Sequence, residues 1–395
     1  MPKTTHAVQL GVAVVHGAAA TGARSIAARP AAKTNESRRD VRIRRGYTNV
    51  AGHSATCEDT RRFLELEPMT HTFARVRLPA LLMFCVFLTA VDLYFVRVKL
   101  SDLSYSQSVA EAQGVVNGTP RLRINQSRIL GPHLVQAIAG LLATTPSRAL
   151  MLFGALCLLG AKLIVVWFRV RDQSAAPTLL MLIAGSGMFA LLVHRYVFPW
   201  DFAGLMIFTA FVVMVLRKVA WPWFVPLIAV AFLNRESAAF LCVWLSIHGI
   251  LNGTGERSRF LQVGAGLCLA TLGLLFVNSL RTVAVVQEAS NLGPKWLMFM
   301  LRWNLVDLVN AIHTGNIALP LFFGVLLLGM GSAAIVGIRH FPKHTALCVC
   351  CTLEMVFILL FGIVDEPRVM IELIPFYTVF LPSLLFDGSI TRTVQ

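Results

Sequence analysis

Long apolar stretches separated by short polar segments fill the chain from Leu78 to Phe386. They lack the short apolar–polar alternation of a transmembrane β-barrel strand, and helices satisfy their own backbone hydrogen bonds in lipid. The pattern predicts an all-α fold, a polytopic transmembrane helix bundle of about nine or ten spans. The single spans are expected at residues 78–95, 150–168, 178–193, 202–216, 260–278, 317–338, 347–363 and 370–386.

The segment from Trp221 to Ile250 has two interpretations. It is either one long span or a hairpin of two short helices hinged at Asn234-Arg235-Glu236. The hairpin keeps the basic residues before and after the segment on one side of the membrane, as the positive-inside rule favours. In either case, charged residues within an apolar segment are candidates for function.

Amphipathic external helices are expected at Leu103–Val116, Ile129–Leu142 and Trp296–His313. A helix of the length of Ile129–Leu142 rises only about 21 Å, which is short of the membrane core. The third helix carries Asn304, Asp307 and Asn310 as a narrow polar stripe. That stripe either faces a substrate or floats among lipid headgroups.

The composition agrees with a membrane protein. Hydrophobic residues make up 56% of the chain and charged residues 14%, whereas soluble domains carry roughly 25% charged residues. Much of the net charge of +15 lies in the N-terminal region and in short loops, which is typical of cytoplasmic segments and does not indicate nucleic-acid binding. We expect a multi-pass membrane protein in contact with membrane lipid.

Three regions are expected along the chain. Residues 1–77 form a basic cytoplasmic N-terminal region, residues 78–388 the transmembrane domain, and residues 389–395 a cytoplasmic tail. Met69 followed by a short basic segment would suit a translation start. The preceding 68 residues are therefore either an untranslated extension of the gene model, or a disordered cytoplasmic tail or targeting segment.

Cysteine usage gives no sign of a disulfide framework or of a metal site. The eight cysteines are mostly in or beside apolar stretches, where cysteine behaves as a small hydrophobic residue. The cluster Cys348-Val349-Cys350-Cys351 has no histidine at zinc spacing. We therefore expect no metal ligands and no cofactor; a divalent metal ion is an alternative without residues to support it.

The charged residues of the apolar region gather at the outer ends of the expected spans. The candidates are Asp102, Arg128, Asp201, Arg235, Glu236, Asp365, Glu366 and Arg368. Carboxylates and arginines together suit a reaction in which a carboxylate takes a proton from a hydroxyl acceptor and arginines hold a phosphate leaving group. The alternative is structural, because such residues also cap helices or neutralise one another.

Three segments resemble the GT-C superfamily, the glycosyltransferases that use polyprenyl-phosphate sugars. The first is Asp102 followed by Arg128-Ile129-Leu130-Gly131-Pro132-His133-Leu134, and the second is Glu366-Pro367-Arg368 continuing to Pro375. The third is Asn234-Arg235-Glu236-Ser237, which is similar to a motif of bacterial members. The resemblance implies that Asp102 is the catalytic base, although Ser101-Asp102-Leu103-Ser104 lacks the second acid that the family often has. We expect Glu236 to be a second catalytic residue, and the expected substrate-binding residues are Arg128, Asp201, Arg235, Glu366 and Arg368.

The expected partner is a lipid-linked sugar donor, with an acceptor that the sequence does not identify. The resemblance therefore implies the transfer of a hexosyl or pentosyl group on the external side of a membrane, which we expect to be the bacterial inner membrane. Two alternatives stay open: a transporter or flippase of a lipid-linked or small polar substrate, and a polysaccharide polymerase or ligase. Inverted repeats commonly accompany transporters, and no convincing repeat relates the two halves of this chain.

Overall fold

The computed structural model describes residues 67–120, 123–170, 175–193, 196–253, 255–281, 301–315, 344–361 and 367–383, with some positions between 321 and 335. Every regular element in these ranges is a helix, so the predicted all-α fold is confirmed. The elements are α2 (Glu67–Lys99), α3 (Asp102–Val116), η1 (Arg123–Ser127), α4 (Leu130–Leu141), α5 (Pro146–Val170), α6 (Ala175–Leu192), α7 (Pro199–Leu216), η2 (Trp221–Trp223), α8 (Phe224–Asn234), α9 (Ala238–Asn252), α10 (Glu256–Leu280), α11 (Leu301–His313), α13 (Thr345–Phe361), η6 (Pro367–Leu373) and η7 (Phe376–Phe380).

Four of these helices are long and apolar enough to cross a membrane: Leu78–Lys99, Pro146–Arg169, Pro199–Leu216 and Glu256–Leu280. Shorter apolar helices lie at Leu130–Leu141, Ala176–Leu192, Trp221–Asn234, Ala238–Asn252, Thr345–Leu360 and Met370–Ser383. Their lengths and composition indicate a membrane protein. The expected span at 317–338 lies largely outside the described residues, and the exact number of spans stays a prediction.

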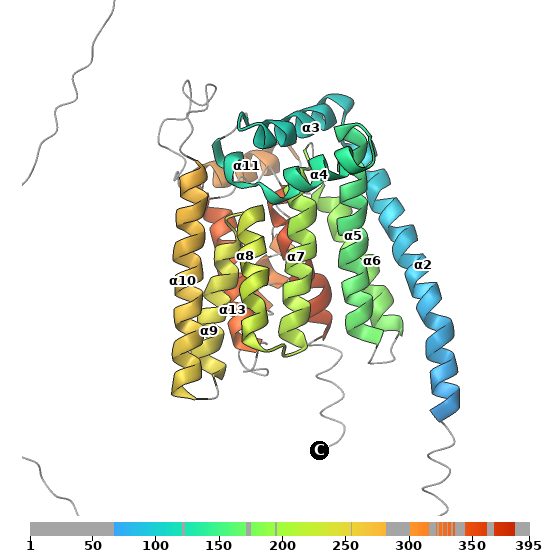
Figure 1. Ribbon diagram of the computed structural model, residues 1–395, viewed down its shortest axis with the longest axis vertical. Coiled ribbons are helices and arrows are strands. Elements are labelled where there is room, and N and C mark those ends of the chain that lie inside the picture. Colours follow the sequence, from blue (N-terminus) through green and yellow to red (C-terminus); the bar gives the residue numbers. More distant parts are fainter. Residues whose placement is uncertain are drawn as a thin grey trace, which may run out of the picture. The chain divides into compact units, whose positions relative to one another are not determined.

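Upright helices and crossing helices divide the bundle into two parts (Figure 1). The helices α2 and α5 to α10 stand upright together with α13, whereas α3, α4 and α11 lie across one end. α4 packs against α3, α5, α7 and α8. The three crossing helices overlap the three external helices predicted from the sequence; residues 296–300 of the third lie outside the described residues.

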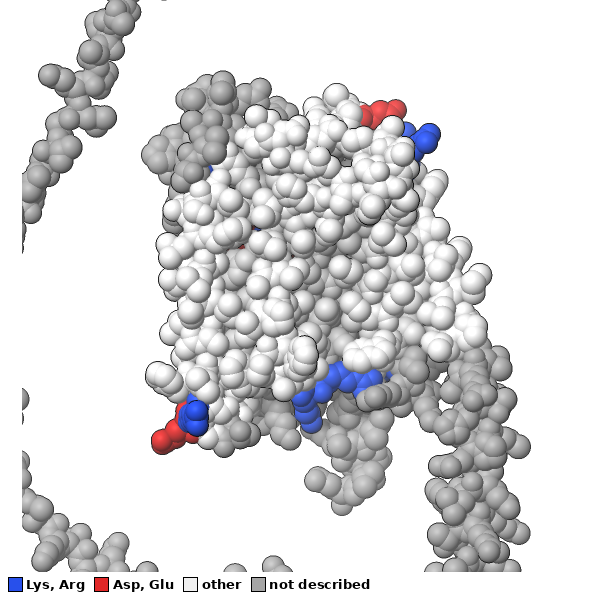
Figure 2. Space-filling model, in the orientation of Figure 1, with Lys and Arg blue, Asp and Glu red and all other residues white. Residues whose placement is uncertain are grey.

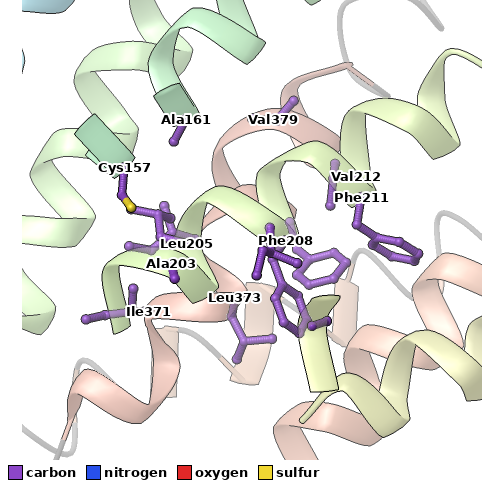
Figure 3. Close-up of a cluster of buried hydrophobic side chains, with 14 of the residues drawn as sticks. Cys157, Ala161, Ala203, Leu205, Phe208, Phe211, Val212, Ile371, Leu373 and Val379 are labelled. Carbon is purple, nitrogen blue, oxygen red and sulfur yellow. The ribbon is translucent and has the colours of Figure 1, made fainter. Parts of the chain in front are cut away.

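The helix α7 forms the centre of the core. Its apolar side chains pack against α5 and against η6. Figure 3 shows Leu205 and Phe208 of α7 together with Ile371 of η6. Farther along α7, Phe211 contacts the Trp244 ring of α9 edge-on at 5.0 Å between centroids. Large aromatic side chains contribute much apolar contact at such places. The core therefore fixes the position of α7, which carries Asp201 in its first turn.

Charged side chains appear at the two ends of the bundle and are almost missing from the band between them on the face in view (Figure 2). At membrane depth a charge costs several kcal/mol, so an apolar band is the surface expected of a membrane protein. The charges that the sequence places in this region are mostly turned inward.

A close contact between α4 and the start of α7 depends on Gly131. A β-carbon at this position would lie 2.8 Å from Cβ of Pro199 and 3.0 Å from the backbone nitrogen of Trp200. Backbone atoms cannot move aside as a flexible side chain can. Gly131 therefore allows the crossing helix to lie directly on the end of α7.

We expect Gly131→Ala to lower the free energy of unfolding by about 1–3 kcal/mol through overpacking. Gly140→Ala on the same helix is the control, because no atom lies within 4 Å of the β-carbon added there. That control should be neutral or stabilising, since alanine is the better helix former. Denaturant unfolding of the purified variants tests the difference, and equal stability of the two would show that α4 does not depend on this contact.

Candidate functional site

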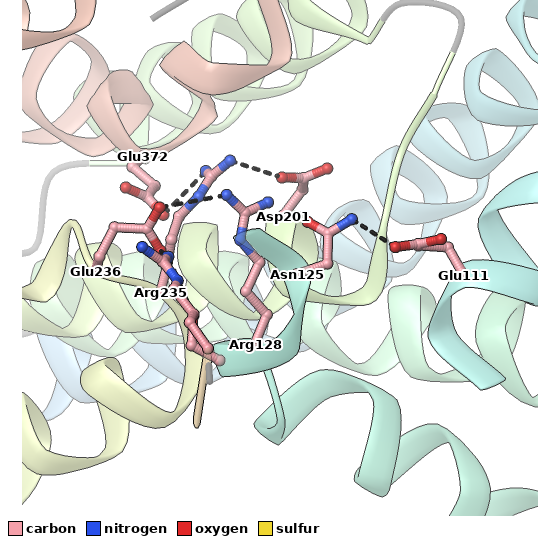
Figure 4. A network of polar contacts seen from close by, with 9 residues as sticks. Glu111, Asn125, Arg128, Asp201, Arg235, Glu236 and Glu372 are labelled. Atoms are coloured by element: carbon pink, nitrogen blue, oxygen red, sulfur yellow. Dashed lines mark hydrogen bonds and ion pairs between the residues drawn. The ribbon is translucent and has the colours of Figure 1, made fainter. Parts of the chain in front are cut away.

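A network of ion pairs lies where the crossing helices meet the upright ones (Figure 4). Its side chains come from segments far apart in the sequence: η1 and the residue after it, the first turn of α7, the break between α8 and α9, the end of α10, and η6. Two groups of ion pairs can be distinguished within it, one centred on Arg235 and the other on Glu236.

The first group consists of Arg235 between two carboxylates. Nη2 of Arg235 lies 3.6 Å from Oδ1 of Asp201, and Nη1 lies 3.3 Å from Oε1 of Glu372. All three side chains are buried. Such a group is strongly sensitive to the loss of one member, because the remaining charges are then left in the interior without compensation.

Local structure holds both carboxylates in place. The backbone N–H of Phe198 donates to Oδ2 of Asp201 at 2.9 Å, which fixes this acid at the start of α7. Gly204, one turn further on, leaves room for Glu372: a β-carbon there would lie 2.9 Å from its Oε1. The first turn of α7 therefore orients one acid and accommodates the other.

The break between α8 and α9 brings Arg235 into the network. α8 ends at Asn234, whose side-chain amide donates to the carbonyl of Trp200 at 2.9 Å. Arg235 then adopts an extended backbone, and α9 begins at Ala238. The hinge predicted at Asn234-Arg235-Glu236 is therefore present. Broken helices at membrane depth are tolerated where their freed groups are buried in protein or line a cavity.

The second group consists of Glu236 between two arginines. Oε1 of Glu236 lies 3.5 Å from Nη2 of Arg128, and Oε2 lies 3.1 Å from Nη2 of Arg281. Arg281 follows the last residue of α10, where the helix dipole favours a cation. Its Nη2 also donates to the hydroxyl of Ser127 at 3.1 Å. The two guanidinium groups thus converge on one carboxylate.

Electrostatics keep Glu236 ionised. The guanidinium groups of Arg128 and Arg281 each contact one of its oxygens and favour the charged carboxylate over the neutral acid. A carboxylate held in two ion pairs is a weak general base, because taking up a proton would break them. In this arrangement, therefore, Glu236 is better suited to be an ion-pair partner than a proton acceptor.

Two further contacts support the second group from the side of the crossing helices. The Arg128 guanidinium lies over the Trp200 ring at 5.1 Å from its centroid, in cation–π geometry. Near it, the amide of Asn125 donates to Oε1 of Glu111 on α3 at 2.7 Å. η1 is therefore tied to both α3 and α7.

The structure brings together four of the predicted site residues: Arg128, Asp201, Arg235 and Glu236. Asp102 is not among them. It is the first residue of α3, its side chain is 86% exposed, and its Oδ1 lies 2.6 Å from Nη2 of Arg97. Ser101, not Asp102, caps the helix by accepting from the backbone of Ser104.

The late segment is only partly described. Asp365 and Glu366 lie outside the described residues, and Arg368 is placed in η6 without a description of its side chain. Their predicted roles stay predictions.

Sequence reasoning missed the residues that complete the network, which are Glu372, Arg281, Asn125 and Glu111. Glu372 lies in the segment from Glu366 to Pro375, which resembles the family. As an isolated acid in an apolar stretch, it could have been recognised as a candidate. Arg281 resembles an ordinary loop residue in the sequence, and nothing local identifies its partner 45 positions earlier.

A separate buried ion pair lies deeper in the bundle. Nζ of Lys162 on α5 lies 2.5 Å from Oδ2 of Asp92 on α2, and Ser186 on α6 donates to the same oxygen at 3.3 Å. A small cavity of about 40 Å³ adjoins the pair, and it also contacts Thr209 and Thr378. Both charges were visible in the sequence as single charged residues within apolar spans.

The residues that the structure describes form no recognisable metal site. No group of three or more His, Cys, Asp or Glu side chains there could hold a metal ion. The expectation that the protein has neither metal nor cofactor stays a prediction.

Comparison of the chain with protein-family models, with curated proteins and with solved structures gives no match in any of the three. The resemblance to the GT-C superfamily therefore stays a prediction that rests on the motifs quoted above.

Proposed function

We propose that the protein is a multi-pass membrane glycosyltransferase that moves a sugar from a polyprenyl-phosphate carrier to a hydroxyl acceptor. The proposed location is the bacterial inner membrane, with the end that carries α3, α4 and α11 on the external side. A lipid-linked sugar can enter such a bundle sideways from the bilayer, and the crossing helices offer a surface to the acceptor.

The observation that carries the proposal is the convergence of Arg128 and Arg281 on Glu236. Guanidinium groups bind carboxylate and phosphate with the same forked geometry. A donor phosphate could therefore take the position of the Glu236 carboxylate between the two arginines. The Glu236 side chain is 30% exposed and that of Arg281 14%, whereas the side chains of the first group are at most 8% exposed, so the second group is the more accessible one.

Arg235 has a different role in this proposal. It already neutralises Asp201 and Glu372, so it has little positive charge to offer a phosphate. We assign it to positioning the hinge, and with it Glu236. Arg368 keeps its place as a further candidate for phosphate binding.

Asp102 is the proposed catalytic base. Its carboxylate lies at the water-exposed start of α3, where an acceptor arriving from the aqueous side would meet it. The assignment rests on the family resemblance, and it requires the donor's sugar to reach beyond Glu236 toward α3.

Binding of polyprenyl phosphate to the reconstituted protein tests the phosphate site. Arg128→Lys and Arg281→Lys each keep the charge but lose the fork, and we expect each to weaken binding by about 10- to 100-fold, the equivalent of one charged hydrogen bond. Arg97→Lys, at an exposed ion pair, should bind as the wild type does. If both site variants bound polyprenyl phosphate as the wild type does, Arg128 and Arg281 would not be the phosphate-binding residues.

The Asp92–Lys162 pair favours a second candidate function, a transporter or flippase. Charged residues buried at membrane depth often mark substrate or proton pathways, and this pair adjoins a cavity lined by α2, α5, α6, α7 and residues 374–379. Vesicles that contain the protein would distinguish the two functions, because a flippase moves the lipid-linked sugar across the membrane without consuming it. A polysaccharide polymerase or ligase would consume it, as the proposed transferase does, and differs in the acceptor.

A further inference from the structure

Glu354 is an acid whose carboxylate has no hydrogen-bonding partner. It lies near the middle of α13, its residue is 1% exposed, and neither oxygen has a hydrogen-bond partner among the described residues. Buried polar groups are nearly always hydrogen-bonded. A fully buried acid with two unsatisfied oxygens therefore needs an explanation.

The charged neighbours of Glu354 are Glu372 on η6 and Arg235 at the α8–α9 break. Its other titratable neighbours are the thiols of Cys350 and Cys351 on its own helix, and Cys242 on α9 lies next to Cys350. Arg235 is thus the one cation near it in the described part of the chain, and that guanidinium already contacts two carboxylates.

The charges of the two ion-pair groups balance without Glu354. Arg128, Arg235 and Arg281 supply three positive charges, and Asp201, Glu236 and Glu372 supply three negative ones. An ionised Glu354 would add a buried negative charge with no donor to accept from, which costs several kcal/mol. Protonation removes this charge.

We propose that Glu354 is a proton-binding site within the apolar layer: it is held as a neutral carboxylic acid, while Glu372 stays ionised as a partner of Arg235. This inference does not depend on the proposed transferase activity.

Infrared spectroscopy of the full chain in lipid nanodiscs at neutral pH tests the proposal directly. A protonated carboxylic acid has a C=O stretching band that a carboxylate lacks. We expect Glu354→Gln to remove one such band from the wild-type spectrum and Glu372→Gln to retain it. Glu256→Gln is the control, because Glu256 is an exposed acid in the first turn of α10 and its replacement should remove no band.

Thermal unfolding provides a second measurement. Glutamine has the shape of the neutral acid, so Glu354→Gln should melt no lower than the wild type, whereas Glu372→Gln should melt lower because Arg235 loses a partner. A Glu354→Gln spectrum with the band still present would overturn the proposal. So would a strong loss of stability in this variant, since it would mean that the negative charge itself is needed.

Discussion

Replacement of Arg235 by methionine is expected to lower the free energy of unfolding by about 3–5 kcal/mol, the usual cost of removing one partner from a buried ion pair. The methionine side chain fills similar space, so the loss reflects charge rather than a cavity. Asp201 and Glu372 would both remain in the interior without the cation that they share. Arg235→Lys should lose less, because it keeps the charge.

Arg97→Met is the matched control for this experiment. It removes the same type of side chain from an exposed ion pair with Asp102, and exposed pairs contribute about 0–1 kcal/mol. Denaturant titration of both variants in detergent gives the comparison. If Arg235→Met proved as stable as Arg97→Met, the two acids would have to be protonated in the folded protein, and the ion-pair description of the first group would be wrong.

Asp102→Asn is expected to reduce sugar transfer by a factor of about 100 to 10,000, the typical effect of removing a general base. Asparagine keeps the size and polarity of the side chain but cannot take a proton from the acceptor. Donor binding should be unchanged, because Asp102 lies outside the ion-pair network. Transfer from a polyprenyl-phosphate sugar and binding of the polyprenyl phosphate are the two measurements.

The structure also removes a competing explanation for such a loss. Ser101 supplies the helix cap, so a structural effect at this helix end should appear in Ser101→Ala instead, which we expect to cost about 1 kcal/mol of stability and little activity. Full transfer by Asp102→Asn would refute the assignment and leave the other acids at this end of the bundle, among them Asp201, as the candidates for the base.

The sequence predicts the helices well because lipid imposes a simple rule on them. Long apolar stretches must be helical, so α5, α7 and α10 follow from hydropathy alone. The break at Asn234-Arg235-Glu236 was also predictable, since three polar residues within an apolar segment of this length leave few other conformations. The short crossing helices α3 and α4 followed from lengths that do not span a membrane.

The pairing of charges could not be predicted in the same way. The sequence marks Arg235 as a charged residue in an apolar surround, and on that ground we expected it to bind a phosphate. Its two carboxylate partners lie 34 and 137 positions away, and which acids reach it depends on how α7 and η6 pack. Local charge balance is a property of packing. Arg128 is a candidate from the sequence, but its convergence with Arg281 on Glu236 becomes visible only in the structure.

The shortness of α8 determines how deep the ion-pair network lies. Together with η2 it rises only about 21 Å, whereas the hydrocarbon core is about 30 Å thick. α4 crosses above its end (Figure 1), and one helix diameter of about 10 Å makes up the difference. The exposed side chains of Leu134 and Leu141 on α4 suit such a position among acyl chains. The upright helix α8 and the crossing helix α4 above it would then together span the thickness of the hydrocarbon core. A carrier phosphate bound at Arg128 would have to leave the plane of the headgroups and descend by about the width of a helix.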